Sequence, residues 1–438
     1  GTMFSKEAKS LQLKLIELNP KDSFQSSLAL FERSVRLLRG VPFNEWYDKT
    51  RNLDKEEVND IAKGMLQQRK DLILPGIIRS GKKKWVELQE LNAPNGIPTP
   101  HGEGLWPGNF DARGNFYLTS LHKLKHDEDQ LRFNVQHGLM PDVFLEVADN
   151  YTLLLDTLEL KNGVMNVNSF VFLDTFALET VGTTYNWLNF RSHLPKIIDG
   201  TALHASTDFG MAEQEYYSGE RAPGLTVVDD FLSPKALNDM LFFLQSSTIW
   251  FDVKNGYLGA YFNDGLSTPL LGQIEDELRV KMPNVIGNLS LNTVWAYKCS
   301  NTSPEGLAIH ADMAAVNINL WLTPTDSNIE LNDDESGGSG GLIVYLTRDE
   351  DLPKDWNFHA MNSFADSSIE KMYNFVKETK SQKIQIPYKQ NRATIFHSRL
   401  FHESAKFKFK NDYKNSRINL TFLFGSPDLD KKFTTWDF

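Results

Sequence analysis

A histidine and an aspartate stand two residues apart at the start of an apolar segment, in "AIHADMAAVNINLWL". Residues i and i+2 of an extended chain point to the same face, so His310 and Asp312 could bind one metal ion. A third ligand would have to come from a distant segment, and "TIFHSRLFHES" offers two histidines, His397 and His402. The spacing predicts a metal centre of two histidines and one carboxylate.

Two histidines and one carboxylate are the ligand set of non-haem Fe(II) oxygenases, and they leave coordination positions open for a cosubstrate and dioxygen. If the cosubstrate is 2-oxoglutarate, its remote carboxylate needs a fixed cation, ideally the forked guanidinium of an arginine. Arg417 lies fifteen residues beyond His402 and opens the predicted strand "RINLTFLFG", which one short turn would bring back to the metal site. We therefore expect Arg417 to anchor the cosubstrate.

Four segments in this order resemble the Fe(II)/2-oxoglutarate-dependent oxygenases of the prolyl-hydroxylase-like branch: "AIHAD", "GGLIVYL", "RATIFHSRLFHES" and "RINLTF". The resemblance covers roughly residues 225 to 425. It implies that Fe(II), 2-oxoglutarate and O2 are the cofactors, and that succinate and CO2 are released. The family's distal ligand follows a Pro-Ser-x-x-x-His turn, which "HSRLFH" matches, so the resemblance selects His402 over His397.

The family's cosubstrate pocket uses the strands beside the metal ligands. Tyr297 matches a common aromatic position near 2-oxoglutarate. In "AVNINLWLT", Asn317, Asn319 and Trp321 alternate on one face, and in "RINLTF" Asn419 and Thr421 share a face with the arginine. Buried asparagines are costly without partners, so this face is interpreted as the pocket lining. A solvated face is the alternative. The residues expected to bind the cosubstrate are Arg417, Tyr297, Asn319 and Thr421.

Substrate contacts are expected from a second group of residues. Arg399 lies in the turn before His402, where it would either face solvent or bind a substrate carboxylate. The aromatic-rich segment "STIWFDVKNGYLGAYFNDG" would lie near the mouth of the site or form interdomain core. The candidates are Arg399, Trp321, Tyr261 and Asn317.

The fold class expected is α+β. Short strands separated by Gly, Pro, Asn and Asp fill the second half and suggest a double-stranded β-helix, or jelly roll, with flanking helices. Helical periodicity dominates residues 4–73, as in "KEEVNDIAKGMLQQ" with Asp54 as its cap. The expected domains are residues 1–219, helical and mixed, with a substrate-covering or dimerising role, and residues 220–438, the oxygenase domain.

Composition excludes several classes of protein. The 438 residues carry a formal net charge of −11, and "GKKKW", interpreted as a solvated turn, is the one dense basic run, so a nucleic-acid partner is not expected. No apolar run approaches the ~20 residues of a membrane span. The single cysteine, Cys299, excludes an intrachain disulfide and suits an intracellular, cytoplasmic protein. The oligomeric state stays open.

Several functions remain in competition. The first is oxidation of a C–H bond, by hydroxylation, desaturation or ring closure, in a small, acidic, amino-acid-derived metabolite. A peptidyl hydroxylase, a non-catalytic jelly-roll binding module and a zinc hydrolase with the same ligands are the alternatives. A zinc hydrolase would have no use for Arg417. His122 and His126, four apart in the polar "LHKLKHDEDQ", are expected on an exposed helix face.

Overall fold

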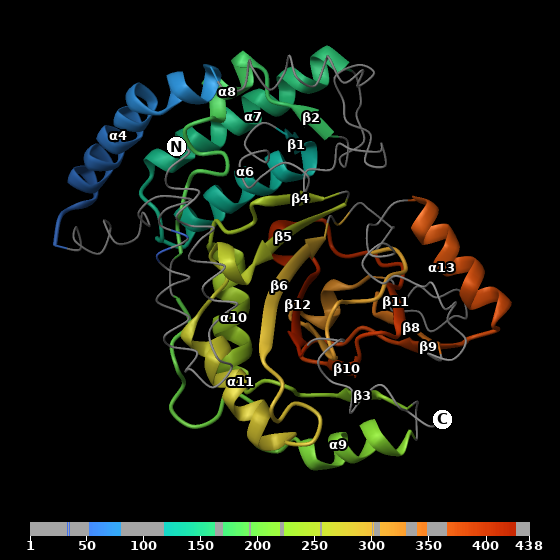
Figure 1. The fold of residues 1–438 in the computed structure, drawn as a ribbon. Helices are drawn as coiled ribbons and strands as arrows, with labels where there is room; N and C mark the ends of the chain where they lie inside the picture. The colour runs from blue at the N-terminus through green and yellow to red at the C-terminus, as the bar shows by residue number, and fades with distance from the viewer. Residues whose placement is uncertain are drawn as a thin grey trace. The chain divides into compact units, whose positions relative to one another are not determined.

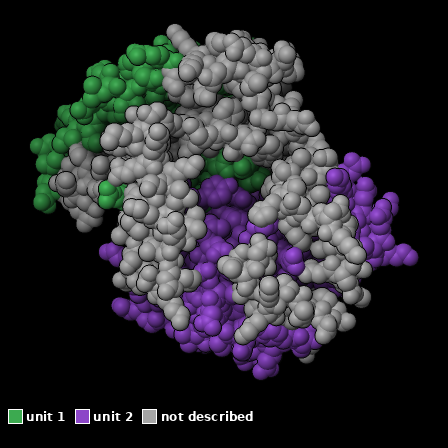
Figure 2. All heavy atoms as spheres, in the orientation of Figure 1, with its two compact units in different colours: residues 1–9, 33–194, 242–260 green, residues 10–32, 195–241, 261–438 purple. Residues whose placement is uncertain are grey.

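The computed structural model describes residues 33, 35, 52–79, 118–162, 170–191, 194–219, 223–254, 256–299, 301, 307–329, 340–347 and 366–425. The chain divides into two compact units, coloured in Figure 2. Unit 1 comprises residues 1–9, 33–194 and 242–260, and unit 2 comprises residues 10–32, 195–241 and 261–438. Gly219, the expected boundary, lies inside unit 2, so the functional division at that residue stays a prediction.

Unit 1 is a helical layer with two short pairs of antiparallel strands. Its helices are α4 (Lys55–Leu72), α6 (Leu121–Gln136), α7 (Val143–Asn162) and α8 (Thr175–Val181). Strands β1 (Leu118–Ser120) and β2 (Phe170–Phe172) form one antiparallel pair, and β4 (Asp252–Lys254) and β5 (Tyr257–Tyr261) form another. The core lies where α4, α6, α7 and α8 meet, around Leu124, Phe144 and Leu178. None of the described helices is long and apolar enough to cross a membrane.

Caps fix where the helices of unit 1 begin. Asp54 accepts hydrogen bonds from the amides of Glu56 and Glu57, and Glu57 bonds back to the Asp54 amide, which completes a capping box. The predicted helix with its cap is confirmed. Ser120 caps α6 by accepting from the Lys123 amide. The helices predicted before residue 39, and the "GKKKW" turn, lie outside the described residues apart from residues 33 and 35.

Unit 2 contains five strands of a large antiparallel sheet. They run in the order β3 (Leu225–Val228), β10 (Ala393–His397), β7 (Val316–Trp321), β12 (Ile418–Phe424) and β6 (Leu291–Cys299). Every residue of β7, β10 and β12 is buried, as expected of central strands covered on both faces. Each of these five strands was predicted from its β-branched and aromatic run.

A second sheet of three strands lies opposite the large one (Figure 1), in the order β11 (Phe401–Ser404), β8 (Leu342–Leu346) and β9 (Gln382–Ile386). Helix α13 (Asp366–Glu378) covers its outer face through Met372, Phe375 and Val376. The remaining helices are α9 (Phe209–Ser218), which packs on β3, α10 (Pro234–Ser246), which carries the chain into unit 1, and α11 (Pro269–Lys281). Two facing antiparallel sheets are compatible with the predicted jelly roll.

Candidate metal centre

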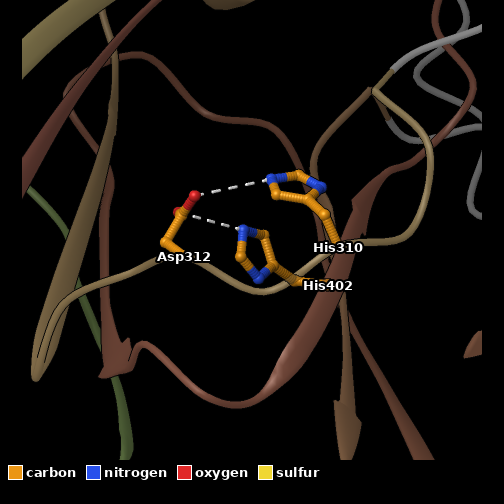
Figure 3. A group of neighbouring side chains, drawn as sticks. All are labelled: His310, Asp312 and His402. Carbon is orange, nitrogen blue, oxygen red and sulfur yellow. Dashed lines mark ion pairs between the residues drawn. The ribbon is translucent and has the colours of Figure 1, made fainter. Parts of the chain in front are cut away.

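The predicted metal ligands His310, Asp312 and His402, called the triad below, meet at one point. One ligand atom from each lies within 4.8 Å of the others. Among the described residues, this is the group of three or more His, Cys, Asp or Glu side chains that could hold a metal ion. Both imidazole Nε2 atoms face the carboxylate (Figure 3), at 3.9 Å from Asp312 Oδ1 for His310 and 3.4 Å from Oδ2 for His402. The structure thus brings together the three residues that the sequence predicted as ligands.

Backbone pairing positions the two histidines. The His310 amide donates to the His402 carbonyl at 2.9 Å, and the His402 amide donates to the His310 carbonyl at 2.8 Å. The Asp312 amide donates to the Ser398 carbonyl at 3.0 Å, which fixes the third ligand relative to the turn before β11. All three ligands are therefore held by backbone hydrogen bonds between two distant segments.

The outer nitrogens of the imidazoles set their tautomers. His310 Nδ1 lies 2.7 Å from the Ala308 carbonyl, and His402 Nδ1 lies 3.0 Å from the Leu400 carbonyl. A ring nitrogen that faces a carbonyl oxygen must carry the proton, so in the neutral ring Nε2 keeps its lone pair. Both lone pairs are thus directed to the place where a metal would bind, and the backbone carbonyls orient the rings as in known metal sites.

Burial favours the neutral, metal-binding form of His310, and neighbouring groups favour the ionised form of Asp312. Burial lowers the pKa of His310 to about 4, and the nearby His402 ring adds to this shift. Burial raises the pKa of Asp312, but the two neighbouring imidazoles and the hydrogen bond from Asn317 outweigh it, so the pKa lies below its ordinary value. Near neutral pH the His310 ring is neutral and Asp312 is ionised. These residues fit a divalent cation such as Fe(II).

His397 is excluded from the centre by the register of β10. It pairs with Val316, whereas the preceding residue, Phe396, pairs with Asn317. Neighbouring residues of a strand point to opposite faces, and Phe396 packs edge-on to the His402 ring at 4.8 Å. His397 therefore lies on the face away from the triad, in agreement with the choice of His402.

Arg417 is a buried cation whose described hydrogen-bond partners are all neutral groups. Its Nε donates to the Gly340 carbonyl at 3.0 Å, and its Nη1 lies 3.4 Å from Asn419 Oδ1 and 3.7 Å from Cys299 Sγ. The guanidinium also lies 5.1 Å from the centre of the Phe407 ring. No carboxylate among the described residues pairs with Arg417, which is 2% exposed. A buried guanidinium in such surroundings is ready to receive an anion.

The asparagines of β7 and β12 do not lie on a solvated face. Asn317, Asn319, Asn419 and Thr421 are all buried. Thr421 Oγ1 donates to Asn319 Oδ1 at 2.8 Å across the two strands. Asn317 Nδ2 donates to Asp312 Oδ2, so the residue expected to touch substrate contacts a predicted metal ligand, and its role toward substrate stays a prediction. Sequence spacing could not reveal this contact, because the chain must turn between Asp312 and β7 before the two side chains meet.

The other predicted residues take different places. Tyr297 is half-buried and stacks on Trp295, with ring centres 5.9 Å apart, and Tyr261 approaches Tyr297 edge-on at 6.5 Å. Trp321 is 1% exposed and packs on Tyr388. Arg399 is half-buried in the turn between β10 and β11, and its charge, after burial, lowers the pKa of His397. Their roles with cosubstrate or substrate stay predictions.

Glu403 was missed by sequence reasoning. It follows His402 on β11 and accepts hydrogen bonds from the hydroxyls of Tyr345 on β8 and Tyr373 on α13. These two bonds tie the strand that carries His402 to the neighbouring strand and to the covering helix. The only available signal was the alternation of β11, which places Glu403 on the face opposite the ligand.

Comparisons with known proteins give low similarity. No family model matches the chain, and no curated protein matches it. The crystal structure of the non-heme alpha ketoglutarate dependent epimerase SnoN from nogalamycin biosynthesis is similar at 12% identity and a TM-score of 0.33, over 50% of this chain and 83% of that chain. A SnoN complex with Fe3+, alpha ketoglutarate and nogalamycin RO is similar at 12% identity and a TM-score of 0.32, over 52% of this chain and 90% of that chain.

A prolyl 4-hydroxylase from Phytophthora capsici is similar at 11% identity and a TM-score of 0.31, over 54% of this chain and 70% of that chain. Similarities of this size assign no function, and the proposals below rest on the geometry of the triad and Arg417. The solved structures to which this chain is similar, at low identity, include 2-oxoglutarate-dependent non-haem iron oxygenases.

Proposed function

We propose that the chain is an Fe(II)- and 2-oxoglutarate-dependent dioxygenase. The observation that carries this proposal is the combination of two sites in unit 2. One is a triad whose imidazole lone pairs converge with a carboxylate, and the other is the buried guanidinium of Arg417, which no described carboxylate neutralises. A metal site alone would suit a zinc hydrolase, and a binding module would need neither site. An oxygenase that takes a dicarboxylate needs both.

Each residue has a defined task in this proposal. His310 and His402 present Nε2 as ligands, and Asp312 supplies a carboxylate oxygen. Arg417 pairs with the remote carboxylate of 2-oxoglutarate through its N–H donors. Fe(II), when bound, supplies the redox chemistry that couples decarboxylation of 2-oxoglutarate to succinate and CO2 with oxidation of a substrate C–H bond.

We further propose that the substrate is a small metabolite that carries an acidic group, in keeping with an amino-acid-derived compound. Two features support this. Half-buried Trp295 and Tyr297 lie on the same sheet face as Thr421 and Asn419, their register partners on β12, and add apolar surface beside the polar residues. Arg399 adds a positive charge in the turn that leads to β11. The product can be a hydroxylated, desaturated or cyclised compound.

Unit 1 has no assigned chemistry. We keep the proposal that the N-terminal half covers the substrate or mediates dimerisation. Mixtures of free metabolites, and not peptide libraries, should then give turnover with the full chain. Turnover of prolyl peptides alone would replace the small-molecule proposal with the peptidyl hydroxylase.

The decisive experiment measures succinate formed from 2-oxoglutarate in air, with and without Fe(II). The prime substrate need not be known, because slow conversion of 2-oxoglutarate in its absence is sufficient for the measurement. His402→Ala should abolish both Fe(II) binding and succinate formation, whereas the matched variant His397→Ala should retain them. Zn(II)-dependent hydrolysis without succinate formation would favour the hydrolase. Absence of metal binding in the wild-type chain would favour the binding module.

A further inference from the structure

Hydrogen bonds run without a break along the inner face of β12. Arg417 Nη1 donates to Asn419 Oδ1 at 3.4 Å, and Asn419 Nδ2 donates to Thr421 Oγ1 at 3.3 Å. The next bond leaves the strand, since the Thr421 hydroxyl donates to Asn319 Oδ1 on β7 at 2.8 Å. Thr421 and Asn319 are direct partners in the register of the two strands, so this crossing is set by the sheet itself.

The same path continues along β7 to the metal site. Asn319 Nδ2 donates to Asn317 Oδ1 at 3.3 Å, and Asn317 Nδ2 donates to Asp312 Oδ2. The four linking side chains, called the polar chain below, begin at the buried cation and end at the carboxylate of the triad. The polar chain consists of Asn419, Thr421, Asn319 and Asn317.

The direction of every bond is the same. Each member accepts from the side of Arg417 and donates toward Asp312, so all the dipoles point from cation to anion. The two ends enforce this direction, because Arg417 can only donate and an ionised Asp312 can only accept. An amide turned the other way would set NH2 against the guanidinium or oxygen against the carboxylate. Aligned hydrogen bonds in a buried place strengthen one another.

We propose that the polar chain is a positioning device that holds the anchor and the metal carboxylate in one fixed relation. The inference rests on the proposed function and assigns its residues a task other than direct contact with 2-oxoglutarate. The four side chains form hydrogen bonds with one another and with the two ends, so these buried polar groups have partners without any ligand. Loss of a middle link should therefore loosen Asp312 even though the residue removed touches no metal ligand.

Thr421 is the residue to change, because it makes the single crossing between strands. Thr421→Val keeps the shape and removes the hydroxyl, and Thr421→Ser keeps the hydroxyl. Thr394→Val is the matched control. Thr394 pairs with Asn319 in the same row of the sheet, is equally buried, and its hydroxyl has no hydrogen-bond partner among the described residues.

The measurement is the affinity for Mn(II), without any 2-oxoglutarate, by titration followed by electron paramagnetic resonance. Thr421→Val should weaken Mn(II) binding about tenfold, as loss of an outer partner of a metal ligand does, while Thr421→Ser and Thr394→Val stay close to the wild type. Asn319→Ala, which removes the same crossing from the other strand, should match Thr421→Val and serves if that variant fails to fold.

Three outcomes decide the inference. An unchanged Mn(II) affinity in a folded Thr421→Val chain, with or without weaker 2-oxoglutarate binding, would overturn it and leave Thr421 as a pocket residue, with the proposed function intact. An equal loss of Mn(II) affinity in Thr394→Val would show that any substitution in this row of the sheet disturbs the metal site, and it would also overturn the inference. A wild-type chain that bound no Mn(II) would overturn the proposed function together with the inference.

Discussion

Two buried clusters in this chain contain histidine and aspartate, and they differ in what completes them. In unit 1, Lys123 Nζ donates to both Asp127 oxygens at 2.6 Å, and His126 Nδ1 lies 3.0 Å from the same carboxylate. In unit 2, no lysine or arginine forms an ion pair with Asp312 among the described residues, and two imidazoles present Nε2 to it. The first cluster has its own cation, and the second could take one from solution.

The comparison teaches that residue types do not identify a metal site. Both clusters are buried, and both contain a carboxylate beside an imidazole. In the first, the histidine directs Nδ1 to the carboxylate. In the triad, Nδ1 is used by a backbone carbonyl and Nε2 is directed inward. The two clusters thus differ in which imidazole nitrogen faces the carboxylate and in whether a lysine pairs with it.

The strongest test of this difference removes the ligands of the triad one at a time. His310→Ala, Asp312→Ala and His402→Ala should each abolish Fe(II)-dependent succinate formation, because a site with two protein ligands holds the metal too weakly. Binding of Mn(II) should fall in parallel. His397→Ala is the control and should keep substantial activity. Activity in His402→Ala, together with an inactive His397→Ala, would contradict the assignment.

The next test concerns Arg417, the buried cation proposed to anchor 2-oxoglutarate. Arg417→Lys keeps the charge but loses the planar fork, so the affinity for 2-oxoglutarate should fall about tenfold or more while the Michaelis constant of the prime substrate changes less. Titration of the anaerobic Fe(II) protein with 2-oxoglutarate measures the first quantity. If 2-oxoglutarate bound to Arg417→Lys as to the wild type, the anchor would have to lie elsewhere.

A substitution in the unit 1 cluster of Lys123, His126 and Asp127 should lower the stability of the chain and leave metal binding unchanged. Lys123→Met leaves the carboxylate of Asp127 without its lysine in a buried place, with side chains 4% and 12% exposed in the wild type. Removing one partner of such a pair costs about 3 kcal/mol, which urea unfolding would detect. Lys125→Met on the same helix is the control: its side chain is 56% exposed, and it should cost under about 1 kcal/mol. An equal loss in both variants would refute the distinction.

The smallest effect is expected at His397, a buried histidine outside both clusters. Burial, and then the charge of Arg399, lower its pKa from an ordinary 6.5 to about 4. Between these two pH values the unfolded chain binds more protons at this residue than the folded chain, so stability falls as the pH drops from 6.5 to 4. His397→Gln should therefore lose less stability than the wild type over this range. Parallel curves of melting temperature against pH would show that His397 does not contribute.

Much of unit 2 could be predicted from sequence, because the signals are local. The five strands that unit 2 contributes to the large sheet follow from runs of β-branched and aromatic residues, and His310 and Asp312 follow from a spacing of two. His402 needed the family's turn as a guide, since β11 has only four residues and no pattern of its own. The bond from Asn317 to Asp312 was not predictable, because it depends on how the chain turns before β7.

His126 shows the opposite failure. Its neighbours in sequence are polar, and we expected it on an exposed helix face, yet it is 4% exposed and packs edge-on to Trp250 at 6.1 Å. That expectation was wrong because Trp250 is distant in sequence. Local composition describes what a helix could expose, whereas burial is decided by the distant segment that packs on it.

The reciprocal backbone bonds between His310 and His402 have a consequence for metal exchange. The two ligand residues are joined by the main chain whether or not an ion is present, so little conformational entropy is lost when the ion arrives. A chelator should then strip the ion from a chain that stays folded, with an unchanged circular dichroism spectrum. The stripped chain should accept fresh Fe(II) without a refolding phase, so that catalytic life is limited by oxidation of the iron and not by loss of the protein.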